Sequence, residues 1–279
     1  MNDLNFVKVV ASGNDFVLLD HYQKKAATDR RSLSTLAKTL CQRKLSVGAD
    51  GLLVVERSSQ ADFKMRIFNP DGREVDMCGN GSRCVALYAF NRKIVAKRVM
   101  SIETRAGILQ AEVKAGAIKV KMSPPKDLHL KFDLNLGGRS YNVSYVNTGV
   151  PHVVCFVRGL DKCDVAAVGR QIRYHSEFLP EGTNADFVEV LSKTHIRIRT
   201  YERGVEEETL ACGTGSVAAA IITVLNMYKE SGCAKFRVRV DTKSGECLLV
   251  YFSLGNAVIN DVYLQGEARI VFAGALRIL

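Results

Sequence analysis

Cys78-Gly79-Asn80-Gly81-Ser82 and Cys212-Gly213-Thr214-Gly215-Ser216 are two versions of one pattern, 134 residues apart. An apolar run follows each block, at residues 85–90 and 217–225, and each run is typical of a buried helix. Each cysteine is therefore expected directly before a helix. Free backbone N–H groups at a helix N-terminus bind anions and favour thiolate over thiol. The pattern predicts two activated cysteines in matching positions.

Three further blocks repeat at almost the same spacing. Residues 10–17 match residues 147–153 through Gly13 and Gly149, at an offset of 136. Residues 49–54 match residues 185–190 at the same offset, and residues 104–107 match residues 242–245 at an offset of 138. Four blocks in one order indicate a duplicated fold. The long period excludes a solenoid, whose repeats are about 20 to 50 residues long.

The predicted fold class is α+β, with strands dominant. We expect two domains, residues 1–122 and 123–265, related by a pseudo-twofold axis, each a mostly antiparallel sheet or barrel around a central helix. Helices are predicted at residues 33–41, behind an Asp29 cap, and over a stripe of Ile221, Ile222 and Leu225 that ends near Gly232. Strands are predicted at residues 5–10, 16–20, 52–56, 63–68, 108–113, 141–146, 153–157, 187–191, 196–201, 236–240, 248–252 and 269–273.

Composition excludes several classes of protein. The 279 residues are 47% hydrophobic and carry a formal net charge of +10, whereas an intrinsically disordered chain is less apolar. The longest apolar stretch, residues 217–225, is about half of the roughly 20 residues that a membrane-spanning helix requires. The first residues lack the pattern of an export signal, so a cytoplasmic location without a membrane partner is expected.

The positive charge raises the alternative of a nucleic-acid-binding module. However, Arg197, Arg199, Arg237 and Arg239 alternate with apolar residues, which is typical of the exposed faces of half-buried strands. The sequence has no zinc finger, recognition helix or RNP-like motif. We therefore expect no nucleic-acid partner.

Eight cysteines are spread along the chain without a C-x-x-C pair or a histidine at metal-ligand spacing. Neither a metal site nor a disulfide framework is predicted, because a chain of this length needs no such staples. A thiol redox protein is a second alternative, but its cysteines are normally close in sequence. The six cysteines without a counterpart in the other half are expected to be core or incidental thiols: residues 41, 84, 155, 163, 233 and 247.

Duplication suggests a use for the two matching cysteines. Equivalent residues of two copies related by a twofold axis face each other across the cleft between domains, a favoured place for ligands. Two thiols on opposite faces of one carbon can remove a proton from one side and return one to the other. The helix N-termini would hold the carboxylate on that carbon and stabilise the charge that develops there. Cys78 and Cys212 therefore predict a racemase or epimerase.

The sequence resembles the diaminopimelate epimerase family over essentially its whole length. The most specific matches are the two cysteine blocks, residues 77–84 and 208–215, and Glu202-Arg203-Gly204; residues 12–16, 68–72, 149–152 and 183–187 match in the same order. The resemblance implies a pyridoxal-independent isomerase that interconverts LL- and meso-2,6-diaminopimelate, in the synthesis of lysine and peptidoglycan precursors, with no cofactor and no metal. We also expect a homodimer. The resemblance further implies that the last strand, within residues 266–279, returns to the first domain.

The resemblance also assigns roles to individual residues. Cys78 and Cys212 would be the acid/base pair, His152 would support them, and Glu202 would hold the substrate's ammonium group. Arg203 would bind the distal end of the substrate, since a guanidinium offers a bidentate fork for a carboxylate. The other substrate-binding residues implied are Gly79, Asn80, Gly213 and Thr214 around the reacting carboxylate, and Asn14, Asn69 and Asn184 at the distal end.

Two positions depart from the family pattern. Val150 stands where many members have Asn, and Gly51 stands where some have Gln. Valine makes no side-chain hydrogen bond, which leaves a related substrate open. The alternative is another cofactor-independent amino-acid racemase or epimerase of the same fold, whereas phenazine-pathway isomerases fit less well because they lack the cysteine pair. Taken singly, His152 also fits a buried core residue, and Glu202-Arg203 fits a surface ion pair.

Overall fold

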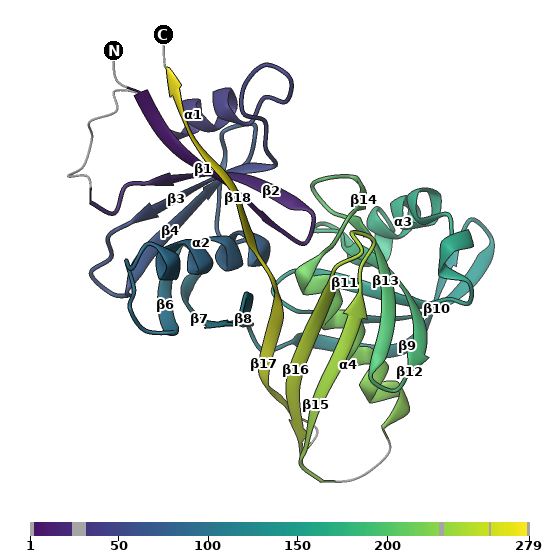
Figure 1. Cartoon of the computed structure of the whole chain (residues 1–279). Coiled ribbons are helices and arrows are strands. Elements are labelled where there is room, and N and C mark those ends of the chain that lie inside the picture. The colour runs from purple at the N-terminus through teal and green to yellow at the C-terminus, as the bar shows by residue number, and fades with distance from the viewer. Residues whose placement is uncertain (1–2, 24–31, 229–231, 257, 278–279) are drawn as a thin grey trace. The chain divides into compact units, whose positions relative to one another are not determined.

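The chain folds into two compact units (Figure 1). The computed structural model describes residues 3–23, 32–228, 232–256 and 258–277. The first unit comprises residues 1–120 and 266–279, and the second comprises residues 121–265. From the sequence alone, the first boundary between domains was expected after residue 122 and the second after residue 265.

The first unit is a sheet whose last strand comes from the C-terminus of the chain. Its strands β2 and β3, and β4 and β6, pair in parallel, and its other pairs are antiparallel. The elements are β1 (Asp3–Ala11), β2 (Asn14–Asp20), α1 (Leu33–Leu40), β3 (Gly51–Glu56), β4 (Phe63–Phe68), β5 (Glu74–Val75), α2 (Gly79–Asn91), β6 (Val99–Thr104), β7 (Gly107–Lys114), β8 (Ala117–Lys121) and β18 (Arg269–Arg277). β18 pairs antiparallel with β1.

The second unit repeats this pattern of pairing, and its elements from β10 to β17 repeat the order of β1 to β8 with two short 3-10 helices added. β9 pairs with β10 as β18 pairs with β1, and the parallel pairs are β11 with β12 and β13 with β15. The elements are β9 (Lys126–Leu136), β10 (Arg139–Asn147), β11 (Pro151–Phe156), η1 (Leu160–Lys162), α3 (Val165–Arg173), η2 (Ser176–Phe178), β12 (Asn184–Ser192), β13 (His195–Glu202), β14 (Glu207–Thr209), α4 (Gly213–Met227), β15 (Ala234–Asp241), β16 (Cys247–Gly255) and β17 (Val258–Glu267). The predicted duplication and the α+β class are confirmed.

The central strands of each sheet are buried on both faces, because one helix packs on each side of them. In β3, Leu52 and Val54 belong to the core that contains α1, whereas Leu53 and Val55 belong to the core that contains α2. A strand buried on both faces reads as a continuous apolar run rather than an alternating one. In the second unit α3 and α4 take the places of α1 and α2.

The two cysteine blocks begin the core helices, as predicted. Cys78 is the N-cap of α2, and Cys212 is the N-cap of α4. α4 is buried from Gly215 to Val224, on all of its sides, because strands of the second unit surround it. Both cysteines are thereby fixed at the ends of helices that the core holds in place.

Other predictions need correction at their edges. All of the predicted strands are present, although Val157 falls just beyond β11. The hydroxyl of Ser32 caps α1 by accepting the N–H of Thr35 at 3.2 Å, and Asp29, the predicted cap, lies outside the described residues. α4 ends at Met227, before Gly232. No helix within the described ranges is long and apolar enough to cross a membrane.

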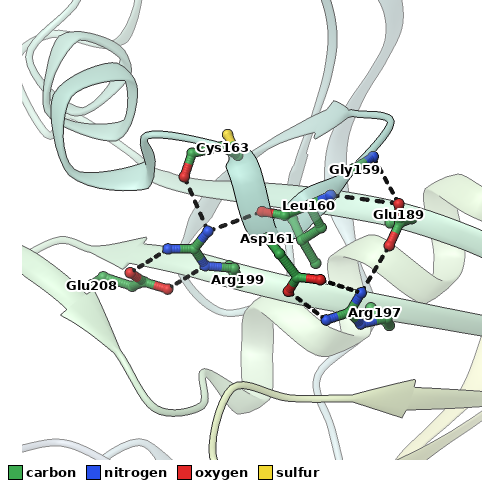
Figure 2. A network of polar contacts seen from close by, with 8 residues as sticks. All are labelled: Gly159, Leu160, Asp161, Cys163, Glu189, Arg197, Arg199 and Glu208. Atoms are coloured by element: carbon green, nitrogen blue, oxygen red, sulfur yellow. Dashed lines mark hydrogen bonds and ion pairs between the residues drawn. The ribbon is translucent and has the colours of Figure 1, made fainter.

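The arginines of β13 bind carboxylates on the surface of the second unit (Figure 2). Arg199 donates to both oxygens of Glu208, at 2.7 and 2.8 Å, and to two carbonyls near η1. Arg197 binds Asp161 and Glu189, and Arg239 of β15 binds Asp241 at 2.8 Å. These three cations are neutralised within the unit, which favours the predicted solvated strand faces over a nucleic-acid groove.

Loss of the Arg199 side chain is expected to destabilise the second unit. The side chain of Arg199 is 19% exposed, and its guanidinium joins β13 to β14 and to the η1 loop. The side chain of Arg197 is 37% exposed. Arg199→Met should lower the free energy of unfolding by about 2 kcal/mol in urea melts. Arg197→Met, the matched control, should cost less than about 1 kcal/mol. Equal losses in the two variants would contradict this difference.

Candidate active site

The first unit contributes Cys78 and the start of α2. The Cys78 sulfur is half-buried and accepts the N–H of Gly81 at 3.4 Å. Gly79 and Asn80 are the first two residues of the helix, where backbone N–H groups have no partner within the helix. The start of α2 therefore offers donors for an anion beside the thiol.

Two asparagine side chains meet at this helix start. Asn80 Nδ2 donates to Asn14 Oδ1, and Asn14 Nδ2 donates to Asp50 at 3.2 Å. Asn69 lies in the turn after β4, where its backbone bonds Arg73 and Gly72. The structure thus gathers Asn14 and Asn80, and it gives no hydrogen bond between Asn69 and either of them among the described residues.

The second unit contributes Cys212 in a buried chain of hydrogen bonds. Cys212 Sγ lies 3.4 Å from Thr214 Oγ1, which lies 2.9 Å from His152 Nε2. His152 Nδ1 lies 2.7 Å from Asp186 Oδ2, and both of these side chains are fully buried. We call these four residues the Cys212 chain.

Asp186 fixes the tautomer of His152 in this chain. A carboxylate only accepts, so Nδ1 carries a proton, and in the neutral imidazole Nε2 then offers its lone pair to the hydroxyl of Thr214. The second oxygen of Asp186 accepts the hydroxyl of Thr200 at 2.7 Å, and Thr148 donates to the Thr214 carbonyl at 2.9 Å. Every hydrogen bond along the chain therefore has a defined direction.

Gly215 allows the Cys212 chain to pass directly beneath α4. A Cβ at this position would lie 2.5 Å from Asp186 Oδ1 and 3.2 Å from His152 Cε1. No side chain fits there without moving the buried carboxylate. The second glycine of the Cys-Gly-x-Gly block is thus required by packing in this unit.

The protonation of Cys212 differs from the sequence prediction. Burial raises the pKa of its thiol well above the usual value, and the negative charges of Glu202 and Asp186 raise it further. These effects oppose the helix N-terminus, which was expected to favour thiolate at each cysteine. Burial, with a smaller effect of Asp186, also raises the pKa of Glu202. Cys212 therefore rests as a thiol, the form of a proton donor.

Asn184 and Arg203 meet at the ends of β12 and β13. Asn184 Oδ1 accepts the backbone N–H of Arg203 at 2.7 Å, and its Nδ2 donates to the Pro151 carbonyl at 2.9 Å. Arg203 is half-buried, and its Nη1 donates to the Glu181 carbonyl at 3.0 Å. The guanidinium is thus oriented without a carboxylate partner among the described residues.

The predicted site residues fall into two groups. Those of the first unit are Asn14, Asn69, Cys78, Gly79 and Asn80, and those of the second are His152, Asn184, Glu202, Arg203, Cys212, Gly213 and Thr214. Sequence reasoning missed Asp186 and Thr200. The alignment of Asp186 with Asp50 in the internal repeat was the available signal. No group of three potential metal ligands occurs among the described residues.

Comparison with known proteins identifies the family. The model of the family described as diaminopimelate epimerase matches residues 6–128 and 144–271. The chain belongs to the diaminopimelate epimerase family. This family is one of isomerases that act as epimerases on a small molecule, in lysine biosynthesis. Its members include the diaminopimelate epimerase of Aquifex aeolicus, 41% identical over 281 residues, which cover 98% of each chain. That of Archaeoglobus fulgidus is 41% identical over 285 residues, which cover 98% of this chain and 96% of the other.

Solved structures of more distant proteins share the fold of this diaminopimelate epimerase family member. A phenazine biosynthesis protein of the PhzF family from Bacillus anthracis superposes with a TM-score of 0.74 at 20% identity, and all of both chains is covered. A hydroxyproline epimerase from Agrobacterium vitis gives a TM-score of 0.65 at 15% identity, over 98% of this chain and 92% of the other. At these identities the likeness concerns the fold alone.

Proposed function

We propose that this chain interconverts LL- and meso-2,6-diaminopimelate with Cys78 and Cys212 as its two acid/base groups. The observation that carries the proposal is that each cysteine is the N-cap residue of the core helix in one copy of a duplicated unit. No pyridoxal phosphate, nicotinamide or metal takes part. We further propose that the enzyme acts in the cytoplasm, and that its product supplies peptidoglycan precursors as well as lysine.

In the proposed reaction Cys78, as thiolate, removes the α-proton from one face of the substrate. The electrons of the C–H bond pass toward the α-carboxylate, where N–H groups at the starts of α2 and α4 stabilise the developing charge. The donors are those of Gly79, Asn80, Gly213 and Thr214. The Cys212 thiol then protonates the opposite face, and the two thiols exchange roles in the reverse direction.

The remaining residues hold the substrate and reset the acid. Glu202 binds the ammonium group, and Arg203 with Asn14, Asn69 and Asn184 binds the distal end. After one turnover Cys78 carries a proton and Cys212 is a thiolate. Cys78 releases its proton to water, water protonates His152, and the imidazolium passes a proton to Cys212 through the hydroxyl of Thr214. Asp186 stabilises the imidazolium that precedes this transfer.

The proposal is tested by α-proton exchange in deuterium oxide with chiral analysis of the product. LL- and meso-diaminopimelate should each give the other isomer, with solvent deuterium at the inverted carbon only. Proline, hydroxyproline, lysine and glutamate complete the panel. Inversion of one of these without turnover of diaminopimelate would overturn the substrate assignment. It would favour a related racemase, consistent with Val150 and with an Arg203 guanidinium bound to a backbone carbonyl.

Glu202 should control the pH dependence of one direction of the reaction. Its negative charge raises the pKa of Cys212, so Glu202→Gln should lower that pKa. In the direction in which Cys212 donates, activity requires the thiol, and the basic limb of the pH profile of kcat should shift to lower pH. Glu207→Gln, on exposed β14 opposite Glu202, should leave the limb in place. A shift to higher pH in Glu202→Gln would contradict the assignment.

We propose that a second copy of the chain docks along β18. This strand pairs with β1 alone within the described ranges, so its outer edge has free backbone groups, and Ile270, Val271 and Phe272 are 38%, 56% and 49% exposed. An apolar strand edge of this kind is a template for pairing.

Phe272→Glu should convert a dimer to a monomer in light scattering, whereas Ile108→Glu, at an exposed position of β7, should not. A monomeric parent protein would refute the proposal.

A further inference from the structure

Arg83 is the largest fully buried side chain in the described parts of the protein. It lies on α2, one turn beyond Asn80, and its Nη2 donates to Asn80 Oδ1 at 2.7 Å and to Ser12 Oγ at 2.6 Å. Ser12 has a φ of 51°, a left-handed conformation that is uncommon outside glycine. Ser12 belongs to the turn from which Asn14 enters β2. One guanidinium thus bonds both the start of α2 and the turn before Asn14.

The four side chains of Arg83, Asn80, Asn14 and Asp50 form one directed series of hydrogen bonds, which we call the amide chain. A guanidinium only donates, so Asn80 presents its oxygen to Arg83 and its Nδ2 to Asn14. Asp50 only accepts, so Asn14 presents its oxygen to Asn80 and its Nδ2 to Asp50. The donor-only and acceptor-only ends fix both amides in the same orientation. Each Nδ2 retains a second N–H, and these are donors for a carboxylate.

The second unit has a counterpart at equivalent positions. Asp186 aligns with Asp50 and Thr214 with Asn80 at the offsets of the internal repeat. The Cys212 chain runs from Asp186 through His152 to Thr214, just as the amide chain runs from Asp50 through Asn14 to Asn80. Each copy therefore connects an aspartate, Asp50 just before β3 or Asp186 within β12, to the second residue of its cysteine helix. The second copy serves proton transfer, and the first contains only groups that hold orientation.

We propose that Arg83 is a positioning residue for substrate binding, which sets the amides of Asn14 and Asn80 with their free N–H groups toward a substrate carboxylate. The inference rests on the proposed function, in which both asparagines bind substrate. Arg83 itself acts only through them. Without Arg83 only Asp50 orients the two amides, and Asn80 Oδ1 loses its donor. The Asn80 amide can then turn and present its oxygen, which repels a carboxylate.

Kinetics of Arg83 variants separate positioning from a general structural role. Arg83→Gln, which can both donate and accept, should raise KM about tenfold with less than a threefold change in kcat. Arg83→Lys keeps a donor-only head and should keep KM within about threefold of the parent. Arg66→Gln is the matched control, since Arg66 lies in the same unit and binds Glu74 outside the amide chain. It should leave both constants unchanged.

Side-chain amide exchange gives a second readout that needs no substrate. The ¹⁵N-bound protons of Asn14 and Asn80 should exchange slowly in the parent protein and at least about tenfold faster in Arg83→Gln. Asp50→Asn removes the acceptor-only end at a side chain 37% exposed, so it tests the amide chain even where Arg83→Gln does not fold. It should raise KM as well. Unchanged exchange in Arg83→Gln, or unchanged KM in Asp50→Asn, would overturn the proposal. If the parent protein does not turn over diaminopimelate, only the substrate assignment fails. The role of Arg83 is still tested, because amide exchange is measured without substrate.

Discussion

Cys78→Ala and Cys212→Ala are each expected to abolish epimerisation, with a loss of at least about 10³-fold in kcat. General acid and base groups contribute about 10² to 10⁴ each, and epimerisation requires both of them in one turnover. Both variants should remain folded, because a single sulfur is deleted at a helix N-cap. Chiral analysis of diaminopimelate measures the loss, and a thermal melt checks the fold.

The two variants should also differ in the exchange that remains. Cys212→Ala keeps the Cys78 base, so the stereoisomer whose α-proton faces Cys78 should still exchange slowly with deuterium oxide, without inversion. Cys78→Ala should show the complementary stereoisomer preference. Cys84→Ala, a buried thiol of α2 outside the proposed pair, is the matched control and should epimerise normally. Undiminished turnover in either catalytic variant would refute the two-thiol mechanism.

Asp186→Asn is expected to lower kcat about 10²-fold while substrate binding changes little. The amide offers an N–H to His152 Nδ1, so the imidazole places its proton on Nε2 and no longer accepts the Thr214 hydroxyl. The direction of the Cys212 chain is then reversed, and a neutral amide no longer stabilises the imidazolium that gives up the proton, so the thiolate formed by proton donation is reset slowly. Steady-state kinetics in both directions measures the effect.

Asp241→Asn is the control for this substitution. Asp241 accepts from His195 Nε2 at 2.7 Å, the same distance as in the buried pair, but at the surface of the same unit. Its loss should leave kcat unchanged. If Asp186→Asn and Asp241→Asn have equal activity, His152 does not reset Cys212 through Thr214.

Local pattern was sufficient for much of the fold. The strands around residues 52–55 and 196–201 and the cysteine-capped helices follow from apolar periodicity and from the duplicated glycine blocks. α3 was not predicted, although Asp164 caps it, because its apolar pattern spans only nine residues and is interrupted by Gly169. β9 was not predicted either, since most of its side chains are exposed. α3 depends on packing against β12 and β13, and β9 depends on pairing with β10, more than on their own sequences.

The predicted site residues came from motifs, but their interactions did not. Asp186 lies next to His152 because β11 and β12 pair in parallel, a register that no local sequence pattern specifies. The same burial that brings these groups together raises the pKa of Cys212, whereas a helix N-terminus considered alone favours thiolate. Arg83 reads in the sequence as an ordinary charged residue after a glycine turn, and only its complete burial indicates a role.

The pairing of β18 with β1 links folding to the order of synthesis. The second unit is continuous over residues 121–265, whereas the first needs residues 266–279 to complete its sheet. On the ribosome β18 emerges after the whole of the second unit. The second unit can therefore finish folding first, the reverse of the N-terminal-first order that is general for multidomain chains. Until β18 has emerged, the nascent chain exposes the open edge of β1, the segment that chaperones and proteases would meet.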